Sequence, residues 1–208
     1  TRSDNAQHRL PAEAVSKIVQ RMPFMEESAA VRVSDWMFAA LPVRLSRNYS
    51  GMAASLKQSG LTFTGHIGNS FFQFNVYDKL TRLLANDVGN LSVCETGFNA
   101  GHSAMLFLSS HQRVAYTGFD LGEYTASRWA AAQMEARYQG KFTVAFGDSR
   151  TTIGRSGTPA ARCDILSIDG EHTYGGVISD LTLLEPFLTP SGVVLIDDCV
   201  SDQRFAGN

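Results

Sequence analysis

Short apolar runs alternate with amphipathic stretches over the second half of the chain. Between the runs, apolar residues recur at the three- and four-residue spacing of helices that cover a buried surface. This alternation predicts βαβ units around a parallel sheet. The expected strands are residues 91–95, 114–119, 142–146, 164–168 and 193–196.

Helices are expected at residues 101–110, 124–138 and 174–188. The second carries a stripe at Ala126, Ala130, Met134 and Tyr138. The third carries a stripe at Val177, Leu181, Leu184 and Leu188, and is expected to close at Pro190 and Gly192. Such helices would cover the two faces of the sheet.

The N-terminal region has a different pattern. One helical stripe consists of Val15, Ile18, Val19 and Met22, and another of Phe72, Val76, Leu80 and Leu83. A Gly-, Ser- and Asn-rich stretch lies between them and predicts a loop that could close over a site. We therefore divide the chain into a helical extension, residues 1–68, and a ligand-binding domain, residues 69–208.

Composition narrows the class of protein. The 208 residues are 44% hydrophobic, which is enough for a full core, and the net charge is -2. With no basic run and no apolar segment of membrane length, we expect neither a nucleic-acid nor a membrane partner, but a small-molecule ligand. Cys94, Cys163 and Cys199 lie in or beside apolar runs, which predicts buried thiols in the cytoplasm or another reducing compartment rather than disulfides.

A glycine loop follows the first expected strand in the sequence LSVCETGFNAGHS, residues 91–103. Gly97 and Gly101 let a ligand approach the backbone, and the helix that follows offers unpaired N–H groups. Glu95 adds a negative charge where a cationic ligand group could lie. The alternative is a glycine-rich turn with a buried, hydrogen-bonded glutamate.

Acidic residues also end the second and third expected strands. Asp120 is placed to accept hydrogen bonds from the two hydroxyls of a ribose. Asp148 and Ser149 are suited to the edge of an adenine. Each could instead be a turn former or helix cap, which is the commoner role of an aspartate after a strand.

A third acidic group is expected where the fourth and fifth strands end, in SIDGEHTY, residues 167–174, and GVVLIDDC, residues 192–199. The carboxylates of Asp169, Asp197 and Asp198 would converge at one edge of the sheet and repel each other. A divalent cation would relieve this repulsion, and ligands that are all oxygen suit Mg²⁺, Mn²⁺ or Ca²⁺, of which we expect Mg²⁺. The alternative is that the aspartates only cap the segments that follow.

The segments VCETGFNAGHS, GFD, FGDS, SIDGEHTY and GVVLIDDC, in this order, resemble class I S-adenosylmethionine-dependent methyltransferases. They are most similar to the metal-dependent O-methyltransferases that include catechol O-methyltransferase and the macrolide sugar O-methyltransferases. The resemblance covers residues 66–200. It implies a Rossmann-like α/β fold with a doubly wound, mainly parallel sheet in the order 3-2-1-4-5.

The family's final antiparallel hairpin is not evident after the fifth strand. Either the chain is shortened here, or the bare edge of that strand is expected to be covered by the N-terminal extension or by a partner such as another copy of the chain in a homo-oligomer.

The resemblance also implies roles for individual residues. The methionine part of S-adenosylmethionine would lie on Gly97, Phe98, Asn99, Gly101 and Ser103, with Glu95 supporting that loop. Asp120 would hold the ribose, and Asp148 and Ser149 the adenine. The divalent cation would lie on Asp169, Asp197 and Asp198. His172 stands where the catechol enzymes have a lysine base, which favours an aliphatic or sugar hydroxyl as the acceptor.

These residues predict methyl transfer to a hydroxyl of a sugar, polyol or phenol. The cation would lower the pKa of the acceptor, and the imidazole of His172 would take its proton. One alternative is a non-catalytic protein that keeps the fold and the cofactor site. Another is a nicotinamide-dependent oxidoreductase, which the missing third glycine and Glu95 oppose. His172 could also be an ordinary helix N-terminal histidine, and Glu171 a solvated neighbour.

Overall fold

The computed structural model describes residues 51–52, 54–63, 67, 71–155, 159 and 162–197. Most of the extension predicted over residues 1–68 lies outside this part of the chain. So do the predicted stripe that begins at Val15, the third proposed metal ligand, Asp198, and Cys199.

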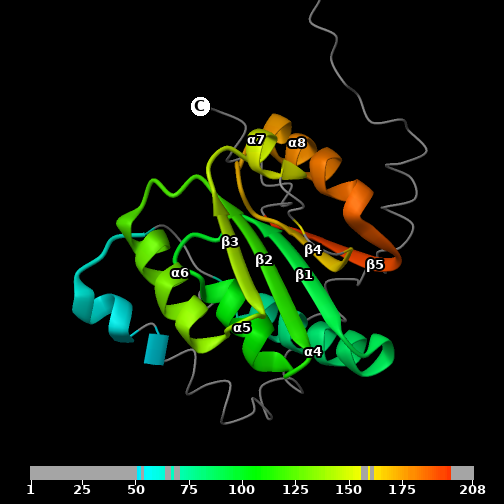
Figure 1. Cartoon of the computed structure of the whole chain (residues 1–208), viewed down its shortest axis with the longest axis horizontal. Helices are drawn as coiled ribbons and strands as arrows, with labels where there is room; N and C mark the ends of the chain where they lie inside the picture. The colour runs from blue at the N-terminus through cyan, green and yellow to red at the C-terminus, as the bar shows by residue number, and fades with distance from the viewer. Residues whose placement is uncertain are drawn as a thin grey trace, which may run out of the picture.

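Five parallel strands form one sheet in the order β3-β2-β1-β4-β5 (Figure 1). The strands are β1 Leu91–Thr96, β2 Val114–Asp120, β3 Phe142–Phe146, β4 Cys163–Ile168 and β5 Leu188–Ile196. The strand order reverses between β1 and β4, and ligands of open α/β sheets bind at such a reversal, beyond the carboxyl ends of the strands. The predicted fold class and strand order are confirmed.

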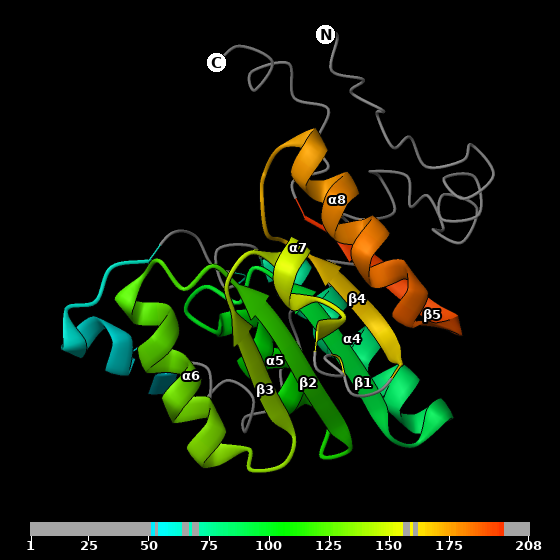
Figure 2. The ribbon, with the colours of Figure 1, turned by 45° about the horizontal axis from the view of Figure 1, so that its top comes forward.

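Helices cover both faces of the sheet (Figures 1 and 2). They are α4 Phe71–Val88, α5 His102–Ser110, α6 Thr125–Arg137, α7 Ser149–Thr152 and α8 Tyr174–Leu184, followed by the 3-10 turn η3 Glu185–Phe187. Helices α4, α5 and α6 lie on one face, and α7 and α8 on the other. The sheet is therefore doubly wound.

Each face of the sheet has its own core, because successive strand residues point to opposite faces. Val93 and Ile165 belong to the core under α4, α5 and α6. Their neighbours Cys94 and Leu166 belong to the core under α8. A strand buried on both faces reads as a continuous apolar run, which is why the sequence locates these strands well.

The described part of the N-terminal extension packs on the first of these cores. Residues 51–52 and 54–59 are helical, and Leu56 is fully buried there. Met52 reaches the glycine loop, since its Cε atom lies 3.0 Å from where a Cβ on Gly101 would stand. None of the described helices combines the length and the apolar character needed to cross a membrane.

Helix α4 buries a different face from the one that its apolar residues predict. Leu83, which belongs to the predicted stripe, is 61% exposed. The buried positions include Phe74, Tyr77, Thr81 and Ala85. Thr81 tolerates burial because its hydroxyl donates to the backbone carbonyl of Tyr77 at 2.6 Å. The prediction from hydrophobicity alone was therefore wrong for this helix.

Helix α8 ends earlier than its apolar stripe predicts. Pro186 cannot continue an α-helix because it has no backbone N–H, and the chain forms η3 there. Strand β5 then starts at Leu188, so Leu188 and Pro190 lie in a strand rather than at the end of a helix. An edge strand tolerates a proline, because one of its sides has no neighbour to receive hydrogen bonds.

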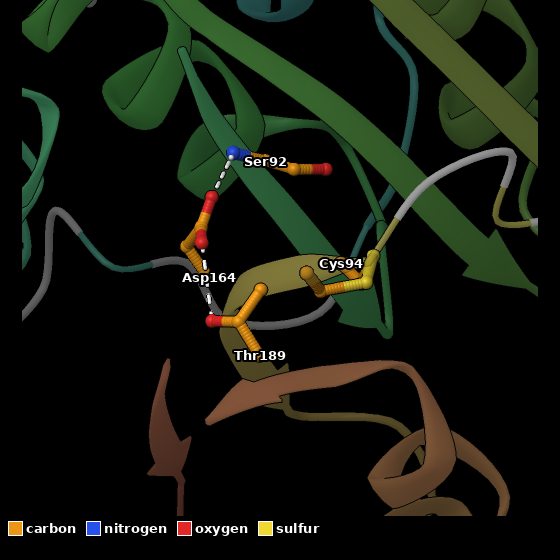
Figure 3. The surroundings of a disulfide bond; sticks show 5 residues. Ser92, Cys94, Asp164 and Thr189 are labelled. Atoms are coloured by element: carbon orange, nitrogen blue, oxygen red, sulfur yellow. Dashed lines mark hydrogen bonds between the residues drawn. A yellow bond between two sulfur atoms is a disulfide. The ribbon is translucent and has the colours of Figure 1, made fainter. Parts of the chain in front are cut away.

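A disulfide joins Cys94 in β1 to Cys163 in β4, with Cα atoms 5.8 Å apart (Figure 3). This corrects the prediction that these cysteines are thiols. Cys94 pairs with Leu166, so a regular strand would turn Cys163 to the opposite face. The register of β4 is irregular between Cys163 and Ile165, and Cys163 joins the core that contains Cys94. A local irregularity of this kind has no signature in the sequence.

Asp164 lies beside the disulfide and ties β4 to both of its neighbours. Its Oδ2 atom accepts from the backbone N–H of Ser92 in β1 at 2.9 Å, and its Oδ1 atom accepts from the hydroxyl of Thr189 in β5 at 3.1 Å (Figure 3). The carboxylate thus holds the start of three adjacent strands.

We expect removal of the Cys94–Cys163 disulfide to lower the free energy of unfolding by roughly 4 kcal/mol, the value for a loop of this length. The measurement is urea unfolding of the wild type with and without reductant, and of the Cys94→Ala/Cys163→Ala variant. The Cys199→Ala control keeps the pair and should still respond to reductant. Identical unfolding of the oxidised and reduced wild type would contradict the disulfide.

Candidate functional site

Two cavities open at the carboxyl ends of β1, β2, β3 and β4. The larger compartment, about 310 Å³, extends over β2 and β3 towards α8, and the smaller compartment, about 220 Å³, lies over β1 beside α4 and α5. Both are lined by Gly97, Asn99, Asp169 and His172. Because they share these walls, we treat them as two parts of one site.

Gly97 lies where the ends of three strands meet. Its φ is +87°, its N–H donates to the carbonyl of Phe119 in β2, and a Cβ at this position would lie 1.8 Å from the backbone oxygen of Asp169. No side chain larger than hydrogen fits between the glycine loop and the turn after β4. The predicted need for glycine therefore has a steric cause.

Asp120 is held at the end of β2 by two backbone N–H groups. Asn99 donates to its Oδ2 atom at 2.7 Å, and Gly122 donates to its Oδ1 atom at 2.7 Å. Each carboxylate oxygen has a second lone pair, so both can still accept a hydrogen bond from a ligand in the larger compartment. Asp120 is thus a fixed acceptor at the position predicted for the ribose.

Asp148 lines the larger compartment but is engaged by Arg150. It caps α7 by accepting from the N–H of Arg150, and its carboxylate pairs with that guanidinium at 2.7 Å. The hydrogen bonds from Arg150 hold the pKa of Asp148 below its usual value. The structure thus matches the helix-cap alternative. Ser149 lines the same compartment, and its hydroxyl donates to Asp180 of α8 at 2.6 Å.

Glu95 is fully buried at the end of β1, in the wall of the smaller compartment. It accepts hydrogen bonds from the hydroxyls of Ser103 in α5 at 2.7 Å, Tyr116 in β2 at 2.5 Å and Ser167 in β4 at 2.9 Å. Burial raises the pKa of this carboxyl to about 7, although the three hydroxyls oppose the shift. Sequence reasoning missed Tyr116 and Ser167, because strand pairing alone brings them to Glu95.

The remaining residues of the glycine loop shape this wall. Phe98 is fully buried and packs on the rings of Tyr116 and Phe142, so much of its surface belongs to the core. Gly101 is the N-cap of α5, and a Cβ there would lie 2.8 Å from the Phe98 ring. Gly101 lines neither compartment, unlike the other predicted residues of the loop.

Asp169, Asp197 and His172 meet in the smaller compartment. The backbone N–H of Asp169 donates to Thr96 in β1, and that of Asp197 donates to Ile168 in β4. These bonds set the ends of β4 and β5 side by side. His172 is 60% exposed, and its Nε2 atom lies 3.7 Å from Oδ1 of Asp169. Glu171 is exposed and accepts from Thr173, consistent with a solvated neighbour.

Gln73 and Tyr77 of α4 form the opposite wall of the smaller compartment. The Gln73 amide donates to Oδ1 of Asp197 at 2.9 Å. Burial, with the nearby carboxylates of Glu95 and Asp197, raises the pKa of the Tyr77 phenol well above its usual value, so the phenol keeps its proton. Sequence reasoning missed both residues, because α4 carries many other polar side chains and nothing in its pattern marks these two.

The carboxylates that line the smaller compartment fit a hard divalent cation only in part. Asp169 and Asp197 offer carboxylate oxygens to one compartment, which is the chemistry that Mg²⁺ requires. The third predicted ligand, Asp198, lies outside the described residues. Among residues 51–197 as described, no three acidic, histidine or cysteine side chains group as a metal site.

A sequence profile described as a methyltransferase domain matches residues 94–199. The chain belongs to this methyltransferase family. The match runs from within β1 past the end of β5, so it includes the whole lining of the larger compartment and most of that of the smaller one, and it sets aside the oxidoreductase alternative. No curated protein sequence matches the chain significantly.

Solved methyltransferase structures share the fold. An O-methyltransferase from Bacillus cereus, in complex with SAH, is 14% identical, with a TM-score of 0.55 over 88% of this chain and 71% of that one. TomG, an O-methyltransferase of tomaymycin synthesis from Streptomyces achromogenes solved with SAM, is 19% identical, with a TM-score of 0.53 over 83% and 74%. An SAH-bound methyltransferase from Podospora anserina is 16% identical, with a TM-score of 0.53 over 85% and 71%.

We expect Glu95 to make stability fall as pH rises. Its pKa is about 7 in the fold and 4.5 ordinarily, so between these values the unfolded chain loses this proton and the folded one keeps it. The loss is complete above about pH 7 and amounts to roughly 3 kcal/mol.

The measurement compares the free energy of unfolding at pH 5 and pH 8. The neutral Glu95→Gln variant should lose less stability than the wild type over this interval. Glu135→Gln, which removes an exposed carboxylate from α6, should behave like the wild type. Equal pH dependence of wild type and Glu95→Gln would contradict the assignment.

Proposed function

We propose that this methyltransferase transfers a methyl group from S-adenosylmethionine to a hydroxyl of a small molecule. The observation that carries the proposal is the meeting of the two compartments at Gly97, Asn99, Asp169 and His172. Residues suited to a nucleoside line one compartment, and a carboxylate pair with a histidine lines the other. The O-methyltransferases of similar fold that were solved with SAM or SAH support the choice of cofactor and of oxygen as the acceptor.

The larger compartment would take the adenosine. Asp120 would accept from the ribose hydroxyls, because two backbone N–H groups already fix its orientation. The methionine part would extend past Gly97 into the smaller compartment, beside Glu95, Phe98, Asn99 and Ser103. Bound S-adenosylmethionine supplies the electrophilic methyl group, and the chain supplies its position relative to the acceptor.

His172 would act as the general base at the junction of the compartments. Its high exposure gives a proton a route to solvent, and the Asp169 carboxylate at 3.7 Å would stabilise the positive charge that the imidazole gains. This proximity supports His172 as the base over the reading of an ordinary helix N-terminal residue.

Asp169, Asp197 and Asp198 would hold a divalent cation, most simply Mg²⁺. When bound, the cation would lower the pKa of the acceptor hydroxyl. The hydrogen bond from Gln73 to Asp197 supports this role, because metal-binding carboxylates are commonly oriented by a second hydrogen bond.

The acceptor class, partners and compartment remain predictions. We propose a sugar, polyol or phenol as the acceptor, with neither a nucleic-acid nor a membrane partner. Among the described strands β5 lies at one edge of the sheet, and a second copy of the chain is one expected cover for its outer side. The predicted reducing compartment rested on unpaired thiols, and the Cys94–Cys163 disulfide removes that support.

Gly97→Ala should weaken binding of S-adenosylhomocysteine by about 10- to 100-fold, because the new methyl group must displace the turn at Asp169. The measurement is calorimetric titration. The matched control is Gly140→Ala, which also has positive φ, +74°, but meets no atom within 4 Å. The control should cost roughly 1–2 kcal/mol of stability and leave binding unchanged. Absence of any binding to the wild type would overturn the proposed function.

His172→Ala should lower turnover by about 100- to 10,000-fold while S-adenosylhomocysteine binds as in the wild type. The measurement is transfer of a labelled methyl group to a panel of sugars, polyols and phenols, with Mg²⁺ or with a chelator. Glu171→Ala is the control and should keep its turnover. Loss of both binding and turnover in His172→Ala would make the residue structural. Cofactor binding without transfer to any acceptor would favour the non-catalytic alternative.

A further inference from the structure

Helix α8 carries a carboxylate on its buried face. Asp180 is only 5% exposed and lies among Gly176, Leu181 and Leu184, the other buried residues of the helix. Aspartates are almost never buried unless they are paired or hydrogen-bonded. Asp180 also lines the larger compartment, so its burial faces a cavity rather than only the core.

The protein satisfies this carboxylate only in part. The hydroxyl of Ser149 donates to Oδ1 of Asp180 at 2.6 Å. Arg150 lies close enough to interact electrostatically with Asp180, but its guanidinium is bound to Asp148. Across the described ranges of the chain, no basic side chain comes within ion-pair distance of Asp180. A carboxylate can accept about four hydrogen bonds, so capacity remains for a donor in the cavity.

A second polar atom points to a ligand at the same place. Thr96 is 2% exposed and lines the larger compartment, and its Oγ1 atom has no hydrogen-bond partner among the described residues. A Cβ on Gly170 would lie 2.5 Å from Oδ2 of Asp180 and 3.3 Å from Oγ1 of Thr96. Both oxygens therefore lie against Gly170.

We propose that Asp180, with Thr96 beside it, recognises the exocyclic amine of the cofactor's adenine. This inference rests on the proposed function and assigns to Asp180 the adenine contact that the family resemblance implied for Asp148 and Ser149. The amine offers two N–H donors and no charge, which suits a buried acceptor that lacks an ion pair. Asp148 is the weaker candidate, because Arg150 already occupies its carboxylate and its side chain is 37% exposed.

The test compares two ligands by calorimetric titration. One is S-adenosylhomocysteine, and the other is its hypoxanthine analogue, which carries an oxygen in place of the amine. The wild type should prefer the amine-bearing ligand by at least about 30-fold, since a carboxylate repels the substituted oxygen. Asp180→Asn has nearly the same shape as the wild type. Its amide oxygen can accept from the amine of one ligand and its amide N–H can donate to the oxygen of the other, so the preference should fall to within about 3-fold.

The matched control is Asp148→Ala, which should keep the wild-type preference. The ratio of the two affinities separates recognition from folding, because a merely structural residue changes both affinities together. Ser149→Ala, which leaves Asp180 in place, should reduce the preference only in part. The proposal is overturned if Asp180→Asn keeps the wild-type ratio, if Asp148→Ala alone loses it, or if the wild type does not discriminate. Failure of the wild type to bind either ligand overturns the proposed function itself.

Discussion

The site depends on how closely the ends of β1 and β4 approach each other. The Cα of Gly97 lies against the backbone of Asp169 so tightly that a Cβ would stand 1.8 Å from the carbonyl oxygen. This contact makes Gly97 and Asp169 walls of both compartments. It also brings the cofactor loop after β1 to the acidic turn after β4. Any ligand that spans the two compartments must pass this point, so the distance between cofactor and acceptor is set by backbone rather than by flexible side chains.

The two buried carboxylates of the site, Glu95 and Asp180, accept hydrogen bonds from hydroxyls rather than from cationic side chains. Glu95 has three hydroxyl donors from three different elements, and Asp180 has Ser149. A hydroxyl offsets less of the cost of burying a charge than a guanidinium does. The folded chain therefore keeps both acids in environments that a donor or cation from a ligand would improve. Asp148 is the contrasting case, because Arg150 already satisfies it at the surface.

The sequence predicted the sheet well and the site only in part. Strands buried on both faces leave continuous apolar runs, so their positions can be read directly. The acids at the ends of β1 and β2, and those that follow β4 and β5, are found where these runs stop. Side chains that join the site through strand pairing or helix packing leave no such pattern. Tyr116 and Ser167 reach Glu95 only because β2 and β4 flank β1. The disulfide depends on an irregular register in β4. Regular alternation of side chains between the two faces of the sheet would place Cys163 on the face opposite Cys94.

Helix α4 shows why the acceptor is harder to predict than the cofactor. The family match begins at residue 94, so α4 lies outside it, yet Gln73 and Tyr77 form one wall of the smaller compartment. Asp197 is fixed from two directions, through its backbone to β4 and through its carboxylate to Gln73. A change in α4 can therefore alter the shape and polarity around Asp197 without touching Asp120 or Gly97. Under the proposed function, the domain that matches the family binds the cofactor. The choice of acceptor then depends on α4, whose buried face the pattern of apolar residues predicted wrongly.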